Sequence, residues 1–90
     1  MEPETFGFGY AIDLLKAGKQ VARKGWNGKG MFLFLVKGGD IAKSLHYGFG
    51  QYENEPDWRN FIAMKTAQCD LVAWVASQSD ILANDWELVK

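Results

Sequence analysis

The sequence predicts an α+β protein, with an N-terminal helix packed on a mostly antiparallel sheet of about five strands. One segment near the start has the apolar spacing of an amphipathic helix. Five later segments have the length and composition of strands, and two of the links between them are short enough for hairpins. We expect residues 1–90 to form a single domain, because chains divide into several domains only at greater length.

The expected helix covers residues 8–17. Thr5 is its expected N-cap, and Lys16 in the last turn followed by Gly18 is typical of a helix C-terminus. Its apolar residues recur at spacings of three and four, as they do on one helix face: Phe8, Ala11, Ile12, Leu14 and Leu15.

Short apolar segments predict the strands. The run 31–36 is continuously apolar, which predicts a central strand buried on both faces, and a glycine-rich loop joins it to the strand before it. Outward- and inward-facing residues alternate in the final strand, which should therefore be partly exposed. The expected strands are residues 20–24, 31–36, 61–66, 70–75 and 85–89.

Two connections differ in kind from these turns. Residues 38–58 are rich in glycine, so we expect an irregular loop there with room for a short helix. Loops of this length in compact domains are usually functional or disordered. Residues 77–83 should form one helical turn, with Ser79 or Asp80 as its cap.

The composition excludes several classes of protein. Cys69 and His46 are the only residues of their types, so no disulfide closes within the chain and structural zinc lacks its usual ligands. No signal peptide begins the sequence, and no apolar run is long enough to span a bilayer. We therefore expect a cytoplasmic protein with no cofactor and no membrane association.

Few residues are arranged as catalysis requires. A nucleophile needs a base within reach, and nothing in the spacing brings Cys69 to His46. The alternatives for these two are a small packing cysteine and an exposed loop histidine. Asp80 and Asp85 more often supply caps and turn bonds than acid–base chemistry. We expect a binding protein rather than an enzyme.

A basic segment precedes the irregular loop. Residues 14–39 hold six basic residues and no acidic one, although the whole chain has a net charge of −1. Such asymmetry indicates either a face that binds an anion or a solvated basic surface. The charges are too few to indicate a nucleic acid polymer as partner.

The first candidate binding motif is Arg23-Lys24-Gly25-Trp26-Asn27-Gly28-Lys29. A tryptophan face stacks on a base, arginine binds phosphate with two parallel bonds, and asparagine both donates and accepts. The alternative is that Trp26 packs in the core and the glycines only turn the hairpin.

The second candidate motif begins where Trp74 leaves its strand. Ser77, Gln78 and Asp80 follow it, and they either bond a polar ligand or cap the next turn. Trp86 is expected to anchor the core or an interface instead of a ligand.

These two motifs resemble a phage protein family. Residues 21–31 and 72–86 are similar to the two halves of the family called Thoeris anti-defence protein two, formerly a domain of unknown function. Residues 8–19 and 61–67 also resemble its N-terminal helix and the strand before the second motif. The resemblance covers nearly the whole chain except about residues 38–58.

The resemblance implies a role inside infected bacteria. Thoeris defence makes a cyclic ADP-ribose isomer as an alarm signal, and members of this family sequester it without degrading it. They form homotetramers whose ligand pockets are shared between protomers. Some members also capture cyclic dinucleotides of a second defence system at a separate site.

Placing side-chain chemistry on the family motifs leads to a set of expected ligand-binding residues. Trp26 and Trp74 would stack on base or ribose, Phe8 would close an apolar wall, and Arg23 would bind phosphate. Hydrogen bonds would come from Asn27, Ser77, Gln78 and Asp80. Two other functions stay open: an oligomeric structural or adaptor protein, and an enzyme that cleaves a cyclic nucleotide.

Overall fold

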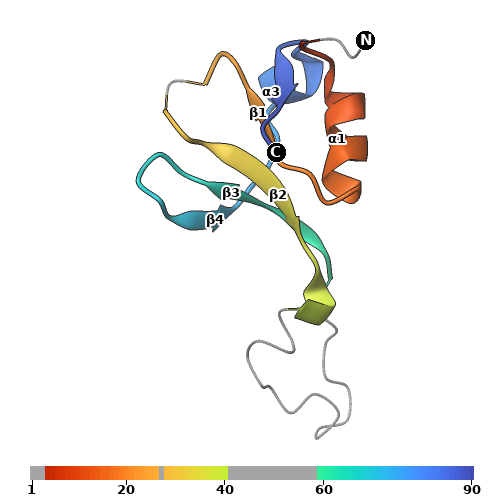
Figure 1. Ribbon diagram of the computed structural model, residues 1–90, viewed down its shortest axis with the longest axis vertical. Helices are drawn as coiled ribbons and strands as arrows, with labels where there is room; N and C mark the ends of the chain where they lie inside the picture. The colour runs from red at the N-terminus through yellow and green to blue at the C-terminus, as the bar shows by residue number, and fades with distance from the viewer. Residues whose placement is uncertain (1–3, 27, 41–58) are drawn as a thin grey trace, which may run out of the picture.

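The computed structural model describes residues 4–26, 28–40 and 59–90 (Figure 1). The expected site residue Asn27 and most of the expected irregular loop, residues 41–58, lie outside the described residues. Over the described ranges the elements in chain order are α1 (Phe8–Lys16), β1 (Val21–Arg23), β2 (Phe32–Val36), β3 (Phe61–Lys65), β4 (Leu71–Ala73), α3 (Gln78–Leu82) and β5 (Trp86–Leu88). None of the described helices is long and apolar enough to cross a membrane.

The strands of this part of the chain form one antiparallel sheet in the order β4-β3-β2-β1-β5. β2 and β3 pair along their full length, from Phe32 opposite Lys65 to Val36 opposite Phe61. The last strand returns to pair with the first, so that Arg23 lies opposite Trp86. The predicted α+β class, both hairpins and the central place of β2 are confirmed.

Helix α1 ends as predicted but begins differently. Gly18 has a φ of 87°, and its N–H and that of Lys19 bond to the carbonyls of Leu15 and Leu14, which closes a left-handed C-terminal cap. The expected N-cap Thr5 is wrong. The N-cap is Gly7 without a side-chain cap, because the helix begins at Phe8, too far along the chain for the Thr5 hydroxyl.

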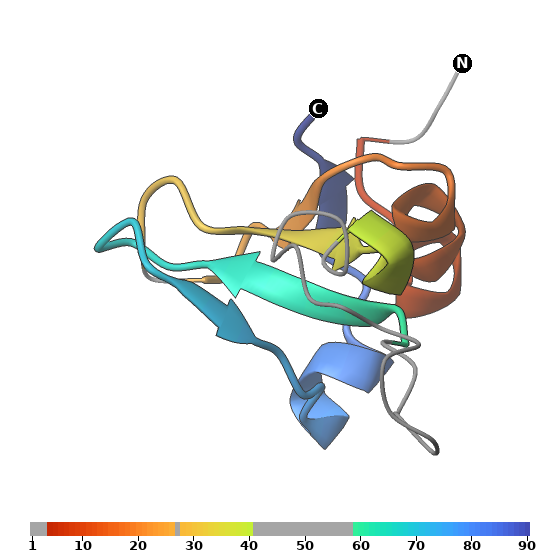
Figure 2. The ribbon, with the colours of Figure 1, turned by 90° about the horizontal axis from the view of Figure 1, so that it is seen from below.

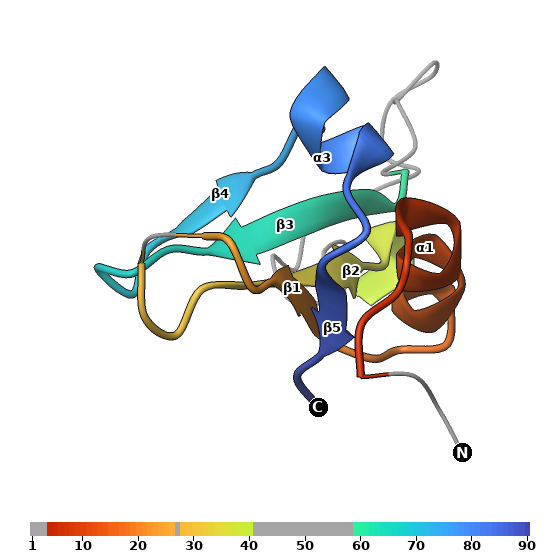
Figure 3. The same cartoon turned by 90° about the horizontal axis from the view of Figure 1, so that it is seen from above.

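The core lies between α1 and the β2–β1–β5 part of the sheet, and Figure 3 shows the helix beside these strands. From the helix come Ala11 and Leu15, and from the sheet Val21, Leu33 and Trp86, all at most 1% exposed. Trp86 is the largest of these side chains, and its position confirms the expectation of a core anchor.

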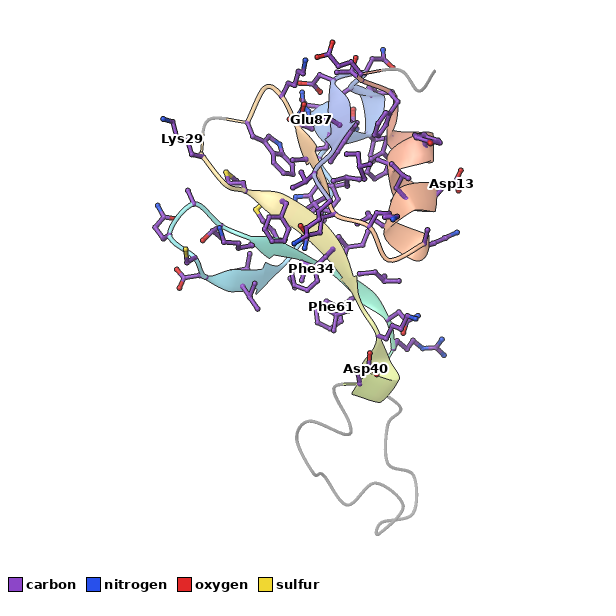
Figure 4. The ribbon with its side chains drawn as sticks, in the orientation of Figure 1. Asp13, Lys29, Phe34, Asp40, Phe61 and Glu87 are labelled. Carbon is purple, nitrogen blue, oxygen red and sulfur yellow. The ribbon has the colours of Figure 1, made fainter. Side chains whose placement is uncertain are left out.

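The prediction that β2 is buried on both faces is wrong. Leu33 is buried, but Phe32 and Phe34 on the other face are only partly covered, because no described element packs there. We call this the open sheet face, and Figure 4 shows Phe34 and Phe61 side by side on it. Its apolar members are Ala22, Phe32, Phe34, Val36, Phe61, Ala63, Leu71 and Ala73.

The expected caps of the second helical segment, Ser79 and Asp80, are also wrong. Ser77 is the N-cap of α3, and its hydroxyl accepts a hydrogen bond from the Asp80 N–H at 3.1 Å. The Asp80 carboxylate accepts the Ser77 N–H in return at 3.0 Å, which completes a capping box. Asp80 therefore stabilises the helix start from inside its first turn.

Cys69 lies in the turn that joins β3 to β4. It is exposed and has a φ of 67°, so it is not the small packing residue that was one expectation from the sequence. The turn is closed by the Thr66 N–H, which donates to the Asp70 carbonyl at 2.8 Å.

Candidate functional site

Four aromatic side chains from distant parts of the chain meet beside α1. Phe8 begins α1, Trp26 follows β1, Trp74 follows β4 and Trp86 lies in β5. Ring centroids are 5.5 Å apart for Trp26 and Trp86, 6.0 Å for Trp74 and Trp86, and 5.4 Å for Phe8 and Trp86. We call these four residues the aromatic cluster. Three of the expected site residues, Phe8, Trp26 and Trp74, are thus brought together.

Trp86 is the centre of this cluster. It is completely buried, and its indole N–H donates to the Asp80 carbonyl at 2.9 Å. Trp26 and Trp74 are partly exposed and contact each other at 6.5 Å with an angle of 61° between their planes. To hold a base between them, two parallel rings must lie about 7 Å apart, which is twice the usual distance between carbon atoms in non-bonded contact. A base at this site would therefore stack on one indole and meet the edge of the other.

Arg23 joins the cluster to two carboxylates. Its Nε donates to Asp85 at 2.8 Å and its Nη1 donates to Asp80 at 2.9 Å. The arginine side chain is 20% exposed and that of Asp80 is 13% exposed, so this ion pair is shielded more than an ordinary surface pair, whereas the Asp85 side chain is 33% exposed. The arginine expected to bind phosphate already has two anionic partners.

These contacts change the electrostatics of all three groups. Hydrogen bonds to Asp85 and Asp80 raise the pKa of Arg23. The pKa of Asp85 is lowered mainly by Arg23 and also by the Gly25 N–H, against the opposing effect of burial. Burial acts to raise the pKa of Asp80, but hydrogen bonds from Ser77, Arg23 and Trp26 outweigh it and lower the pKa. Both carboxylates are therefore ionised at neutral pH.

The polar residues of the second motif lie on one side of the cluster. Ser77 and Asp80 use their side chains for the capping box, which was one of the two alternatives that the sequence left open. Gln78 is exposed in the first turn of α3. Ser77 is exposed as well, but its hydroxyl is engaged in the capping box.

A hollow of about 390 Å³ lies on the other side of Trp26, within the size range of ligand pockets. Cations, an aromatic face and glycine backbone line it, as the first motif predicted, together with the acid Glu87. The lining residues are Ala22, Arg23, Lys24, Trp26, Gly28, Gly30, Met31, Phe32, Glu87 and Val89.

The glycine-rich loop is held against the β3–β4 turn, and Figure 2 shows the two side by side at one end of the sheet. A Cβ on Gly28 would lie only 2.8 Å from that of Ala67, so the close approach requires glycine. Lys65 donates to the Gly30 carbonyl at 3.0 Å from the neighbouring strand. The described part of the loop therefore has fixed contacts on both sides.

The sequence did not indicate Asp85 as part of the site. It was expected only to supply caps or turn bonds, and it does accept the Gly25 N–H at 2.9 Å. Its bond to Arg23 spans 62 positions. The available signal was charge complementarity, because Arg23 lies in a segment without acids and Asp85 lies in the other motif.

Comparison with known proteins shows the family of this chain. The family model described as the Thoeris anti-defense 2-like domain matches residues 6–89. Over 82 residues the chain is 52% identical to a protein of Bacillus phage SP01 named Thoeris anti-defense 2, and the match covers 91% of this chain and 92% of that protein. The chain therefore belongs to the Thoeris anti-defense 2-like family, and it is an anti-defence protein of the phage type.

Proposed function

We propose that this protein sequesters cyclic ADP-ribose-type signalling nucleotides in the cytosol of infected bacteria without cleaving them. The aromatic cluster carries this proposal, since it brings Trp26, Trp74 and Phe8 together from three segments next to a hollow that Lys24 lines. Ligands of this class carry bases and two phosphates, which suit stacking on indoles and a cationic surface.

Six of the expected residues keep their roles in this proposal, and Lys24 takes the place of Arg23 as the cation. Trp26 and Trp74 stack on base or ribose, and Phe8, 6.2 Å from Trp74, forms the apolar wall. Gln78 and Asn27 supply hydrogen bonds. Ser77 adds another, because its hydroxyl oxygen has a second lone pair beside the one that accepts the Asp80 N–H. Lys24 lines the hollow and supplies charge to a phosphate.

The carboxylates of the site support binding without cleavage. A general acid must hold a proton at working pH, and a general base works best with a pKa near that pH. Asp80 and Asp85 both have lowered pKa values and are paired with Arg23. Their ionised, paired state suits a structural role in a binding site.

We also propose that the protein forms a homotetramer with shared pockets. A closed tetramer with two-fold axes needs two distinct contact surfaces, and the described residues offer two apolar ones. The open sheet face has a hollow of about 480 Å³ lined by Phe34, Phe61 and their neighbours. The second surface, which we call the α3 patch, consists of Val75, Ile81 and Leu82, which are 87%, 47% and 75% exposed.

The α3 patch adjoins the aromatic cluster, because Val75 directly follows Trp74. A second protomer seated there would lie next to the two partly exposed indoles and would complete the walls of the pocket. Burial on both sides of a ligand slows its release, and slow release is what a sequestering protein needs.

Calorimetric titration with a cyclic ADP-ribose isomer of the Thoeris type tests the main proposal. Heat denaturation of the complex and chromatography then identify what is released. We expect tight binding and recovery of the intact nucleotide. A cleaved product would favour an enzyme instead. If no heat is observed, a cyclic dinucleotide is titrated next, and failure of both would leave the structural or adaptor function.

Two substitutions test the stacking roles. Trp26→Ala should weaken binding by about 10- to 100-fold, as expected from the loss of one base–aromatic stack. Trp26→Phe should retain part of the affinity. Tyr10→Ala is the control, because that ring packs on Phe6 at 4.7 Å. Unchanged affinity in Trp26→Ala would refute the proposed central role of this residue.

A further inference from the structure

Asp85 holds the start of the Trp26 loop by three separate contacts. Its carboxylate accepts the Arg23 Nε at 2.8 Å and the Gly25 N–H at 2.9 Å. Its carbonyl accepts the Lys24 N–H at 3.0 Å. Three successive residues before Trp26 are therefore tied to one residue that lies next to Trp86.

The backbone of Gly25 lies so close to the Asp85 carboxylate that no room is left for a side chain. A Cβ at position 25 would lie 2.9 Å from the Asp85 carboxylate, a separation that real Cβ atoms essentially never show. Any other residue immediately before Trp26 would therefore displace the Asp85 carboxylate from its present contacts.

Arg23 carries this connection on to Asp80 and the second motif. Its Nη1 donates to Asp80, whose other carboxylate oxygen accepts the N–H and the hydroxyl of Ser77 at 3.0 and 2.9 Å. The Asp80 carbonyl also accepts the indole N–H of Trp86. The helix that follows Trp74 and the loop that carries Trp26 are thereby joined through one guanidinium.

We propose that Asp85 and Arg23 are positioning residues that set Trp26 against Trp74 and Trp86, and that Arg23 is not a phosphate ligand. The effect on nucleotide affinity rests on the proposed function, whereas the effect on the tryptophans does not. A guanidinium that bridges two carboxylates has its charge balanced, and its planar fork suits such a bridge better than lysine does.

Near-ultraviolet circular dichroism of the ligand-free protein tests the positioning directly, because coupled indoles report their mutual orientation. Asp85→Asn should change the aromatic signal of a protein that still unfolds cooperatively in urea. In a Trp26→Phe background the same substitution should produce little further change. Asp13→Asn is the control, since this exposed carboxylate lies on the outer side of α1 (Figure 4). A wild-type spectrum for Asp85→Asn would overturn the inference.

Titration with the same cyclic ADP-ribose isomer separates positioning from phosphate binding. Asp85→Asn and Arg23→Met should each weaken binding about tenfold, as expected for loss of a charged hydrogen bond. The double variant should bind better than the product of the two single losses predicts, because both changes break the bond between Arg23 and Asp85, although each also removes a contact of its own, to Asp80 or to Gly25. Arg23→Lys should resemble Arg23→Met, since lysine lacks the fork that joins both acids.

If Arg23 binds phosphate instead, the opposite results are expected. Removing a competing carboxylate would then preserve or tighten binding in Asp85→Asn, and lysine would largely replace arginine. Either result would overturn the inference. If the wild-type protein binds no nucleotide, the proposed function fails, and the spectra alone decide whether Asp85 positions Trp26.

Discussion

The two acidic residues of the site make its stability depend on pH. Asp80 and Asp85 have pKa values below their usual value of 3.8 in the folded chain, because Arg23, Ser77 and Gly25 donate to them. A carboxylate with a depressed pKa stabilises the fold above its unfolded pKa and loses this contribution as the pH falls through its folded pKa.

We therefore expect the free energy of unfolding to be nearly constant between about pH 7 and 5 and to fall below about pH 4. Urea denaturation at a series of pH values measures it. Asp85→Asn should be less stable at pH 7 and should lose less on acidification. An equally steep acid loss in this variant would show that other carboxylates are responsible.

Cys69 offers a second prediction at the scale of one residue. Its φ of 67° is in the left-handed region, which costs an L residue about 1–2 kcal/mol. Cys69→Gly should remove this strain, but glycine also gains freedom in the unfolded chain. A net gain of about 0.5 kcal/mol is expected in urea denaturation, with Cys69→Ala as the control that keeps the strain. A less stable glycine variant would contradict it.

Single residues also show where prediction from sequence stops. Trp86 was expected to anchor either the core or an interface, and Trp26 either a ligand or the core; only the fold shows that Trp86 is buried in the core while Trp26 and Trp74 are partly exposed. The bond between Arg23 and Asp85 is equally hidden, because residues 62 positions apart meet only after the sheet has formed.

The positions of the helices and strands were predicted better than the residues at which the helices begin. Apolar runs of strand length indicated all five described strands, since side-chain periodicity is a local property. The C-terminal end of α1 at Gly18 was predicted correctly, but the N-cap of α3 was not, because Ser77, Ser79 and Asp80 all have capping chemistry and only backbone geometry selects one. Burial of β2 on both faces was wrong, because burial depends on the layers that pack around a strand.

The cap of α3 allows a prediction at this scale. Ser77→Ala removes the hydroxyl that accepts the Asp80 N–H, and such a loss costs about 1 kcal/mol of stability. Ser79→Ala is the matched control, because Ser79 is exposed inside α3. Thermal denaturation of both variants should show a lower midpoint for Ser77→Ala alone. Equal midpoints would show that the capping box adds little.

At the scale of the whole molecule, the open sheet face determines the proposed assembly. Phe34 lies in the middle of this face, with Phe61 beside it (Figure 4). A charged side chain at position 34 would be buried without an oppositely charged partner in any assembly that covers this face, which is costly. Phe34→Glu should therefore convert the tetramer to smaller species that stay folded.

Light scattering after size-exclusion chromatography measures this mass directly. Asp13→Lys, a charge change on the outer side of α1, is the control and should keep the wild-type mass (Figure 4). A single-chain mass for the wild-type protein would contradict the proposed tetramer. An unchanged tetramer in Phe34→Glu would instead exclude the open sheet face as a contact surface.

The complete burial of Trp86 constrains how a protein of this kind evolves. One side chain is both the largest member of the core and the residue that all three other aromatic rings contact. Under the proposed function, a substitution there would alter nucleotide binding and folding together, so selection for binding a new nucleotide has little freedom at Trp86. Adaptation to a changed host signal should instead accumulate at exposed rim positions such as Gln78, where sequence drift costs the fold little.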